Sequence, residues 1–124
     1  MKGSKGTLPV AFEMDAATVR FVEWGGQTVE LSEIRRALDL TPLFEGLPDN
    51  RCQCPHWGYV IRGSLAYHFA DRTEVFEAGE VYYVAPGHLP HLFADSEYVE
   101  FSPADKIAET LAVIEQNMAK HPIG

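Results

Sequence analysis

Turn-forming residues interrupt this sequence at short intervals, and the segments between them have the length of β-strands. Residues 18–24 are rich in β-branched and aromatic side chains and stop at Gly25-Gly26, a hairpin signal. Further segments of this kind are 27–31, 54–61, 64–70, 73–77, 80–85 and 98–101. Many short strands with frequent turns are typical of a β-sandwich or a β-barrel, and a barrel leaves no sheet edge exposed.

Two stretches near the middle of the chain are less regular. Ile34 and Leu38 fit a short helix that Ser32 would cap, while a bulged strand fits residues 32–38 nearly as well. Residues 40–50 contain two prolines and a glycine, so we expect an ordered loop there.

The C-terminal part predicts one helix at about residues 103–120. Ser102 is the expected N-cap, Pro103 the expected first helical residue and Pro122 the expected stop. Apolar side chains recur with helical spacing along it, at Ile107, Leu111, Ile114 and Met118.

Length and charge limit the possible classes of protein. A chain of 124 residues suits one domain, and we expect a single domain over residues 1–124 with a barrel core at about 18–101. Ten Lys and Arg against eighteen Asp and Glu give a net charge of −8, which argues against binding to nucleic acid or to an anionic membrane. No apolar run approaches the roughly 18 residues of a membrane span, and the N-terminus lacks the apolar stretch of a secretory signal.

The two cysteines, Cys52 and Cys54, are only two positions apart. A disulfide across so small a loop would be strained, so both thiols are expected to be free. Free thiols suit a reducing compartment, and we expect a cytoplasmic protein.

Both cysteines and three of the five histidines lie in two short β segments that each end in a glycine turn. The first segment opens with Cys52-Gln-Cys54-Pro-His56, and the second contains Pro-Gly-His88-Leu-Pro-His91. In an extended chain alternate side chains share a face, so Cys52, Cys54 and His56 are expected to project the same way. The two segments together predict a site but not its reaction.

The glycine-rich hairpin at 58–65, the second hairpin at 77–87 and the strands between them resemble the small single-domain cupins. The resemblance runs from about Asn50 to Phe101. It implies an all-β fold with one C-terminal helix, built as a cupin-like antiparallel β-barrel (a double-stranded β-helix, or jelly roll). Cupins are often dimeric, and many hold a divalent metal ion inside the barrel, so the resemblance also implies a homodimer and a metal site.

The usual cupin ligand set of three histidines and one glutamate is not present. His56 occupies the place of the first motif's glutamate, and Asn50 and Cys52 occupy the places of its two histidines. In the second motif the histidine position holds Pro90, with a histidine close on either side. Two interpretations stay open: a site rebuilt with Cys and His ligands, or a barrel that has lost its metal and uses the pocket otherwise.

The candidate metal ligands are His56, His88, Cys52, Cys54 and His91. Imidazole is the commonest metal ligand, and thiolate suits zinc, iron or copper(I) better than magnesium or calcium. A divalent transition metal, zinc or iron, is therefore the expected cofactor. The alternatives are a hydrogen-bonded core histidine at position 56, turn histidines at 88 and 91, and apolar buried thiols.

Other residues give weaker indications. Trp57 and Tyr59 are expected on the face opposite the candidate ligands, under the helix or at a dimer interface, and His68 is expected to point outward. One of the adjacent Tyr82 and Tyr83 should face inward, but the alternation does not say which. An oxygen ligand or general base is available on the N-terminal strands from Glu13, Glu23 or Glu30.

Two functions fit these observations. The first is a metal-dependent enzyme of the cupin type that acts on a small organic molecule. The second is a non-catalytic barrel that binds or senses a small ligand, with a structural metal or none. A nucleophilic Cys/His pair is a third and weaker possibility, and no hydrolase elbow, phosphate-binding loop or metalloprotease motif is present.

Overall fold

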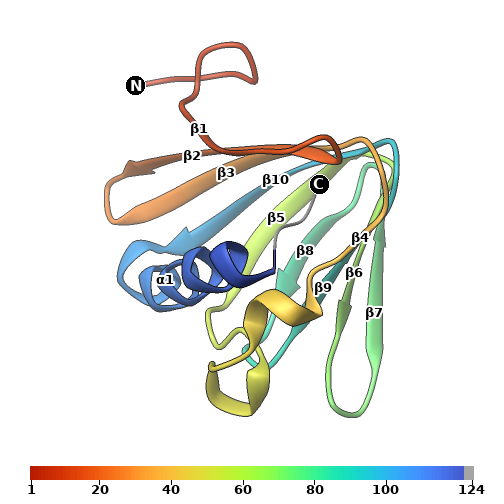
Figure 1. The fold of residues 1–124 in the computed structure, drawn as a ribbon. Coiled ribbons are helices and arrows are strands. Elements are labelled where there is room, and N and C mark those ends of the chain that lie inside the picture. Colours follow the sequence, from red (N-terminus) through yellow and green to blue (C-terminus); the bar gives the residue numbers. More distant parts are fainter. Residues whose placement is uncertain (122–124) are drawn as a thin grey trace.

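The computed structural model of the protein describes residues 1–121 and contains two antiparallel β-sheets and one α-helix (Figure 1). The larger sheet holds six strands, in the spatial order β1 (Val10–Glu13), β2 (Ala17–Trp24), β3 (Gln27–Ile34), β10 (Ser96–Pro103), β5 (His56–Arg62) and β8 (Val81–Val84). The smaller sheet holds four, in the order β4 (Leu38–Asp39), β9 (Leu89–Leu92), β6 (Ser64–His68) and β7 (Thr73–Glu77). The helix α1 (Ala104–Lys120) follows β10 directly.

The two sheets lie face to face, with the main apolar core between them (Figure 1). Leu65 of the smaller sheet and Val60, Val84 and Tyr98 of the larger sheet belong to one buried cluster. The chain passes from the larger sheet to the smaller one through Gly63, whose φ of 73° is a conformation that favours glycine.

The antiparallel jelly-roll fold with one C-terminal helix is as predicted, but the sheets do not close into a barrel. Among the described residues no hydrogen-bonded ladder joins one sheet to the other, so β1 and β8 form the edges of the larger sheet. The fold is therefore a two-layer sandwich, and the expected closure of the sheet edges is wrong.

Most of the predicted strands are confirmed, and the ambiguous stretch at 32–38 begins as a strand. β3 continues to Ile34 because Ser32 pairs with Val19 on one side and with Tyr98 on the other. The short strands β1, β4 and β9 were not predicted. β9 contains Pro90, which has no N–H to donate to a ladder. A proline is unusual inside a strand, so the sequence does not indicate one there. The expected ordered loop carries two short 3₁₀ helices, η1 (Thr41–Phe44) and η2 (Pro48–Asn50).

The helix begins slightly later than predicted. Its N-cap is Pro103, and no side chain caps it, so the predicted N-cap at Ser102 is wrong. Ser102 is instead the second-last residue of β10 and is buried. The predicted stop at Pro122 lies outside the described residues.

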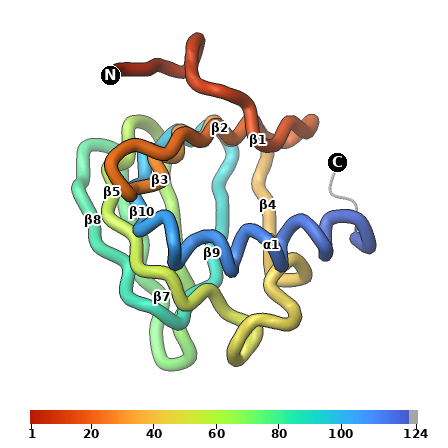
Figure 2. Tube along the Cα trace, turned by 90° about the vertical axis from the view of Figure 1, so that its left-hand side faces the viewer, coloured from red at the N-terminus to blue at the C-terminus, as the bar shows by residue number. Residues whose placement is uncertain are grey.

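The helix packs beside the loop that carries η1 (Figure 2). The side-chain amide of Asn117 donates hydrogen bonds to the carbonyl oxygens of Leu43 and Glu45, each at 2.8 Å. Ile107 at the other end of the helix joins Phe44 in a second buried cluster. Within residues 1–121, no helix has both the length and the apolar character needed to cross a membrane.

Candidate metal centre

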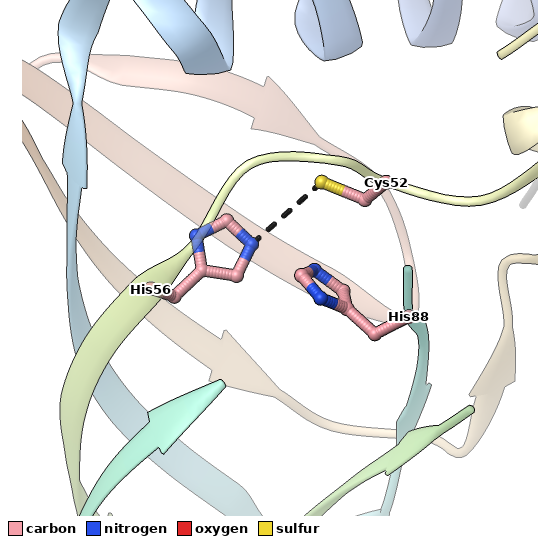
Figure 3. A group of neighbouring side chains, drawn as sticks. All are labelled: Cys52, His56 and His88. Atoms are coloured by element: carbon pink, nitrogen blue, oxygen red, sulfur yellow. Dashed lines mark hydrogen bonds between the residues drawn. The ribbon is translucent and has the colours of Figure 1, made fainter. Parts of the chain in front are cut away.

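Three candidate ligands meet inside the protein: Cys52, His56 and His88. One ligand atom from each lies within 4.8 Å of the others, and all three side chains are buried. Figure 3 shows that Cys52 comes from the loop before β5, His56 from the start of β5, and His88 from the turn before β9. Residues 36 positions apart in the chain thus share one small site.

Backbone hydrogen bonds hold these segments together. The N–H of Cys52 donates a hydrogen bond to the carbonyl oxygen of His88 at 2.9 Å. The N–H of His88 donates one to the carbonyl oxygen of Cys52 at 3.2 Å. Between β8 and His88 the chain turns at Gly87, whose φ is 94°. His56 pairs with Val84 in the β5–β8 ladder, so the strand register sets its position.

In both histidines Nδ1 makes a hydrogen bond to a neighbouring residue, and Nε2 is the nitrogen that remains for a metal ion. Nδ1 of His88 lies 2.7 Å from the carbonyl oxygen of Ala85, an arrangement in which Nδ1 donates and Nε2 keeps its lone pair. That Nε2 atom is buried and has no hydrogen-bond partner among the described residues. Nδ1 of His56 lies 2.7 Å from the hydroxyl of Ser102, and its Nε2 lies 3.8 Å from Sγ of Cys52. A metal-binding histidine typically makes a hydrogen bond of this kind with the ring nitrogen that does not bind the metal.

One distance between candidate ligand atoms is close to that in a tetrahedral site with sulfur and nitrogen ligands. Zn–S and Zn–N bonds of about 2.3 and 2.0 Å place tetrahedral ligand atoms roughly 3.5 Å apart, close to the 3.8 Å between Sγ of Cys52 and Nε2 of His56. The donor set of one thiol and two imidazoles suits zinc or iron. The residues present therefore fit a transition metal.

Burial keeps both imidazoles uncharged. Removal from water lowers the pKa of His56 to about 4. Removal from water, together with the neighbouring His56, lowers the pKa of His88 to about 3. Near neutral pH both rings therefore carry a lone pair that can bind a metal ion. Burial also raises the pKa of the Cys52 thiol, so the thiol keeps its proton near neutral pH and would have to release it to bind a metal ion.

Two hydroxyl groups contact the candidate ligands from elements far away in the sequence. Oγ1 of Thr110, on α1, lies 3.3 Å from Sγ of Cys52. The hydroxyl of Ser102 contacts His56 from β10, as described above. Sequence reasoning missed Thr110 altogether and assigned Ser102 to the helix cap, because neither residue belongs to a recognisable ligand motif.

Two glutamates stand opposite each other on neighbouring strands, and one of them, Glu100, lies beside His56. Glu100 of β10 stands directly opposite Glu30 of β3 in the strand register. Oε1 of Glu100 accepts hydrogen bonds from the hydroxyls of Tyr67 at 2.5 Å and Tyr82 at 2.7 Å, and Oε2 lies 3.8 Å from Nδ1 of His56. Loss of hydration raises the pKa of both carboxyl groups, and the Glu100 charge raises that of Glu30 further.

Of the glutamates considered on the N-terminal strands, only Glu30 borders this region. Glu100 was missed, because its burial follows from the packing of β10 and no sequence motif marks it. Tyr98, Glu100 and Ser102 alternate along β10 and are all buried, so polar residues occupy the inward face of a strand. Tyr82 is the inward member of the tyrosine pair, and Tyr83 is exposed.

The other two candidate ligands lie outside the cluster. The chain at 53–55 is not a strand, so alternation does not place Cys54 beside Cys52 and His56 in one ligand set. Sγ of Cys54 lies 3.3 Å from the carbonyl oxygen of Pro55. The ring of His91 lies near those of His68 and Phe93, with centroids 5.7 and 4.9 Å away.

A cavity of about 110 Å³ adjoins the cluster. Cys52, His56 and His88 line it together with both glutamates, and most of its remaining surface is apolar. Its apolar walls come from both sheets, from η1 and from α1. The candidate ligands thus face a space that a small molecule could enter.

No family model and no curated protein matches the sequence. Solved structures match the fold. The EutQ protein of Clostridium difficile aligns with a TM-score of 0.59 over 87% of this chain and 83% of its own, at 16% identity. An RmlC-like cupin from Shewanella frigidimarina aligns with a TM-score of 0.59 over 86% and 93%, at 11% identity. This chain has the cupin fold.

A third match is the polyketide cyclase RemF of Streptomyces resistomycificus. It aligns with a TM-score of 0.56 over 84% of this chain and 79% of its own, at 15% identity. At such identities the likeness concerns the fold, and fold does not determine function. Any function of this cupin-fold chain has to be argued from its own site.

Proposed function

We propose that this cupin-fold protein binds a divalent transition metal ion, zinc or iron, through Cys52, His56 and His88, and acts on a small organic molecule in the adjoining cavity. One observation carries the proposal. Cys52, His56 and His88 each offer a ligand atom within 4.8 Å of the others, and Nε2 of His88 is buried without any hydrogen-bond partner in the described chain. Buried polar atoms are seldom left in this state unless a ligand completes them.

The number of protein ligands favours catalysis over a structural role. Structural zinc sites use four protein ligands, whereas catalytic sites use three and keep one position open. When bound, such an ion supplies a Lewis acid that polarises a carbonyl group or activates a water molecule. The protein itself orients both imidazoles, through Ser102 and Ala85, and keeps the bound molecule among apolar walls.

Glu100 is placed to assist such chemistry. Its Oε1 is held by the hydroxyls of Tyr67 and Tyr82, while Oε2 remains near Nδ1 of His56. A carboxyl group fixed in this way can hold a proton close to a bound molecule. This residue and Glu30 are the acid–base groups that the site offers besides its candidate ligands.

A second candidate function is non-catalytic binding of a small ligand in the same cavity. The mainly apolar walls favour it, because apolar surface binds a molecule without needing any chemistry. Coordination number discriminates between the two functions: an open position on the bound ion supports catalysis, and a closed four-ligand site supports a structural metal.

The experiment is elemental analysis of protein purified without a metal-affinity tag, with an anomalous scattering map of its crystals. We expect close to one zinc or iron ion per chain beside His88. His56→Ala, His88→Ala and Cys52→Ser should each reduce the metal content strongly. Cys54→Ser and His91→Ala are matched controls, because both side chains lie outside the cluster. Protein without metal after growth in metal-replete medium, or variants with unchanged metal content, would contradict the proposal.

We further propose a homodimer in the cytoplasm. The dimer is supported by aromatic and apolar side chains exposed on the outer face of the larger sheet. The compartment is supported by the two buried free thiols.

A further inference from the structure

A second group of potential metal ligands lies on the outer face of the smaller sheet. Leu65 and Tyr67 of β6 belong to the core between the sheets, so the next side chain in alternation, that of His68, points outward and is exposed. In β9 the side chain of Leu92 belongs to the same core, so its neighbour His91 also takes the outer face. The two histidines thus come from adjacent, paired strands.

The strand register brings these histidines together above a small side chain. Ala66 pairs with His91 in the β6–β9 ladder, and His68 lies two residues further along the same face of β6. Residues in this diagonal relation are within reach of each other when their side chains are long. Because Ala66 carries only a methyl group, the two imidazole rings can meet above it. Their centroids are 5.7 Å apart, and the rings are inclined by 58°.

This separation of the rings is close to that of two ligands on one ion. With Zn–N bonds of about 2.0 Å, two imidazoles on a tetrahedral ion have their centroids roughly 5 Å apart. That value lies between the 4.7 Å of the inner pair, His56 and His88, and the 5.7 Å of the outer pair. The interplanar angle is 58° in both pairs. A small rotation of the exposed His68 side chain would close the remaining distance.

One ring nitrogen of His68 is already held by the neighbouring strand. Nδ1 lies 2.8 Å from Oγ1 of Thr73 on β7, an arrangement in which Nδ1 can donate while Nε2 keeps its lone pair. Nδ1 of His88 in the inner cluster is held in the same way by Ala85. A hydrogen bond at the other ring nitrogen is usual in metal-binding histidines.

A carboxylate stands next to the two histidines. Asp39 of β4 pairs with His91 in the β4–β9 ladder and so shares its face. The hydroxyl and the N–H of Thr41 both donate to Oδ1 of Asp39. These hydrogen bonds lower the pKa of Asp39, and the nearby His91 and His68 lower it further. Asp39 is therefore ionised at neutral pH, and its Oδ2 takes no part in the bonds to Thr41.

We propose that His68, His91 and Asp39 form a second site for a divalent transition metal ion, zinc in the first place, on the outer face of the smaller sheet. Two imidazoles with one carboxylate are a known ligand set for zinc, and they leave one position open to water or to a group of another molecule. In the described chain only the inner cluster gathers three ligand atoms within 4.8 Å, so the outer site closes when the ion binds.

The outer site should bind its ion more weakly than the inner one. It offers no thiolate, and two of its three ligands, His68 and Asp39, are exposed to water. Its ion therefore exchanges with the solvent and is lost during purification. The content of one ion per chain expected beside His88 is unchanged by it.

The test is a zinc titration of the full chain at neutral pH, from metal-free protein to beyond two equivalents, followed by NMR of the histidine ring protons. We expect the signals of His68 and His91 to change together along one saturation curve. Those of His121, an exposed histidine after the helix, should stay unchanged. Signals of His68 and His91 that do not respond, or that respond only as weakly as those of His121, overturn the proposal.

Variants give the contribution of each histidine to the affinity, which calorimetry measures. His68→Ala and His91→Ala should each weaken binding at the outer site at least about tenfold, because even a lost hydrogen bond to a ligand costs about 10–100-fold. His121→Ala is the matched control and should leave the affinity unchanged. An unchanged affinity in either His68→Ala or His91→Ala contradicts the site.

The role of the carboxylate is tested by a change that keeps its shape. Asp39→Asn retains an oxygen that can accept from Thr41 but removes the charge, and it should weaken zinc binding less than the loss of a histidine. Asp105→Asn makes the same change at an exposed position on α1 and should have no effect. Equal affinities of Asp39→Asn and wild type would remove Asp39 from the proposed ligand set.

The inner and outer sites share no ligand, so either can be wrong alone. The same titration separates them, because His56 and His88 report on the inner site. Changes at His68 and His91 without changes at His56 and His88 support the outer site and contradict the inner one. The opposite pattern contradicts the outer site alone.

Discussion

The hydroxyl of Ser102 lies 2.7 Å from Nδ1 of His56 and so links β10 to the first residue of β5. The hydrogen bond occupies one ring nitrogen and leaves Nε2 facing Sγ of Cys52 at 3.8 Å. Both side chains are buried, so water has little access to replace the hydroxyl. Ser102 is therefore a positioning residue for a candidate metal ligand.

Ser102→Ala should weaken metal binding without removing any ligand. Loss of an outer hydrogen bond to a metal-binding histidine costs about 10–100-fold in affinity, and we expect a loss in that range. Competition with a chromophoric zinc chelator measures it. Ser96→Ala is the matched control, since Ser96 is a buried serine of the same strand that bonds to the N–H of Ser64 instead. Equal affinities of wild type and Ser102→Ala would show that the hydroxyl does not position the ring.

Gly58→Ala should disturb the hydrogen bond between Tyr82 and Glu100. A Cβ atom at position 58 would clash with the ring of Tyr82 and lie 2.6 Å from the carbonyl oxygen of Val99. The carbonyl oxygen belongs to the β10 backbone and cannot move aside, so we expect a loss of about 1–3 kcal/mol in the free energy of unfolding.

The measurement for Gly58→Ala is denaturant unfolding, combined with the ultraviolet absorbance of the tyrosines. The control is Gly6→Ala, because a Cβ atom there meets only Oγ of Ser4 at 3.8 Å. A variant of Gly58 as stable as the wild type would mean that the sheet adjusts at this point and that Tyr82 can move.

Much of the fold could be predicted because strands and turns leave local patterns in sequence. Alternating apolar residues and glycine turns revealed seven of the strands, and helical spacing revealed α1. The short strands β1, β4 and β9 were missed because such short pieces carry little periodicity. The prediction that the sheet closes was wrong because closure depends on which strands pair at long range, and no local sequence pattern indicates that pairing.

The site could be predicted only in part, for a similar reason. The prediction that Cys52, Cys54 and His56 share a face assumed a continuous strand from Cys52 to His56. The chain at 53–55 is not a strand, so Cys54 lies outside the cluster of candidate ligands. Glu100 and Thr110 reach the site through the packing of β10 and α1, which follows from the whole fold. The pairing of His88 with the first segment was predictable, because both segments end in glycine turns of a recognisable fold.

Glu30→Gln should change how stability depends on pH. The folded protein raises the pKa of Glu30 above its usual value of 4.5, through loss of hydration and the nearby Glu100 charge. Above that usual value the unfolded chain has released this proton while the folded chain still holds it, so the free energy of unfolding falls as pH rises. The variant lacks this group and should lose less stability between about pH 6.5 and about pH 8.

Across this pH window the loss in free energy of unfolding should be smaller for Glu30→Gln than for wild type by on the order of 1 kcal/mol. Urea unfolding in the presence of a chelator measures it. In the folded protein the lowered pKa values of His56 and His88 leave both rings neutral across this window, and the titration of their unfolded forms near about pH 6.5 is the same in the variant and in wild type. Glu100 and Tyr98 also face Glu30 and remain in the variant. Glu23→Gln is the control at an exposed position. Parallel pH profiles for Glu30→Gln and wild type would mean that Glu30 is ionised in the folded protein.

The last prediction concerns the outer face of the larger sheet. Trp57 and Tyr83 stand side by side there, with ring centroids 5.3 Å apart, and Val81 beside them is 79% exposed. Both Val81 and Tyr83 lie on the edge strand β8, away from α1, so the helix does not cover these aromatic residues. An exposed apolar face next to a free strand edge is typical of an interface between subunits, and two-fold symmetry is the simplest arrangement.

Tyr83→Glu should therefore convert a dimer into a monomer of 13.8 kDa without unfolding it. A carboxylate on each subunit would be brought near its symmetry mate and away from water, which opposes association. Sedimentation velocity at micromolar concentration measures the mass. Val75→Glu is the matched control, because Val75 is equally exposed, at 50%, but lies on β7 of the other sheet. A wild-type protein that sediments only as a 13.8 kDa species would contradict the dimer, and a Val75→Glu variant that dissociates as readily as Tyr83→Glu would move the interface to the smaller sheet.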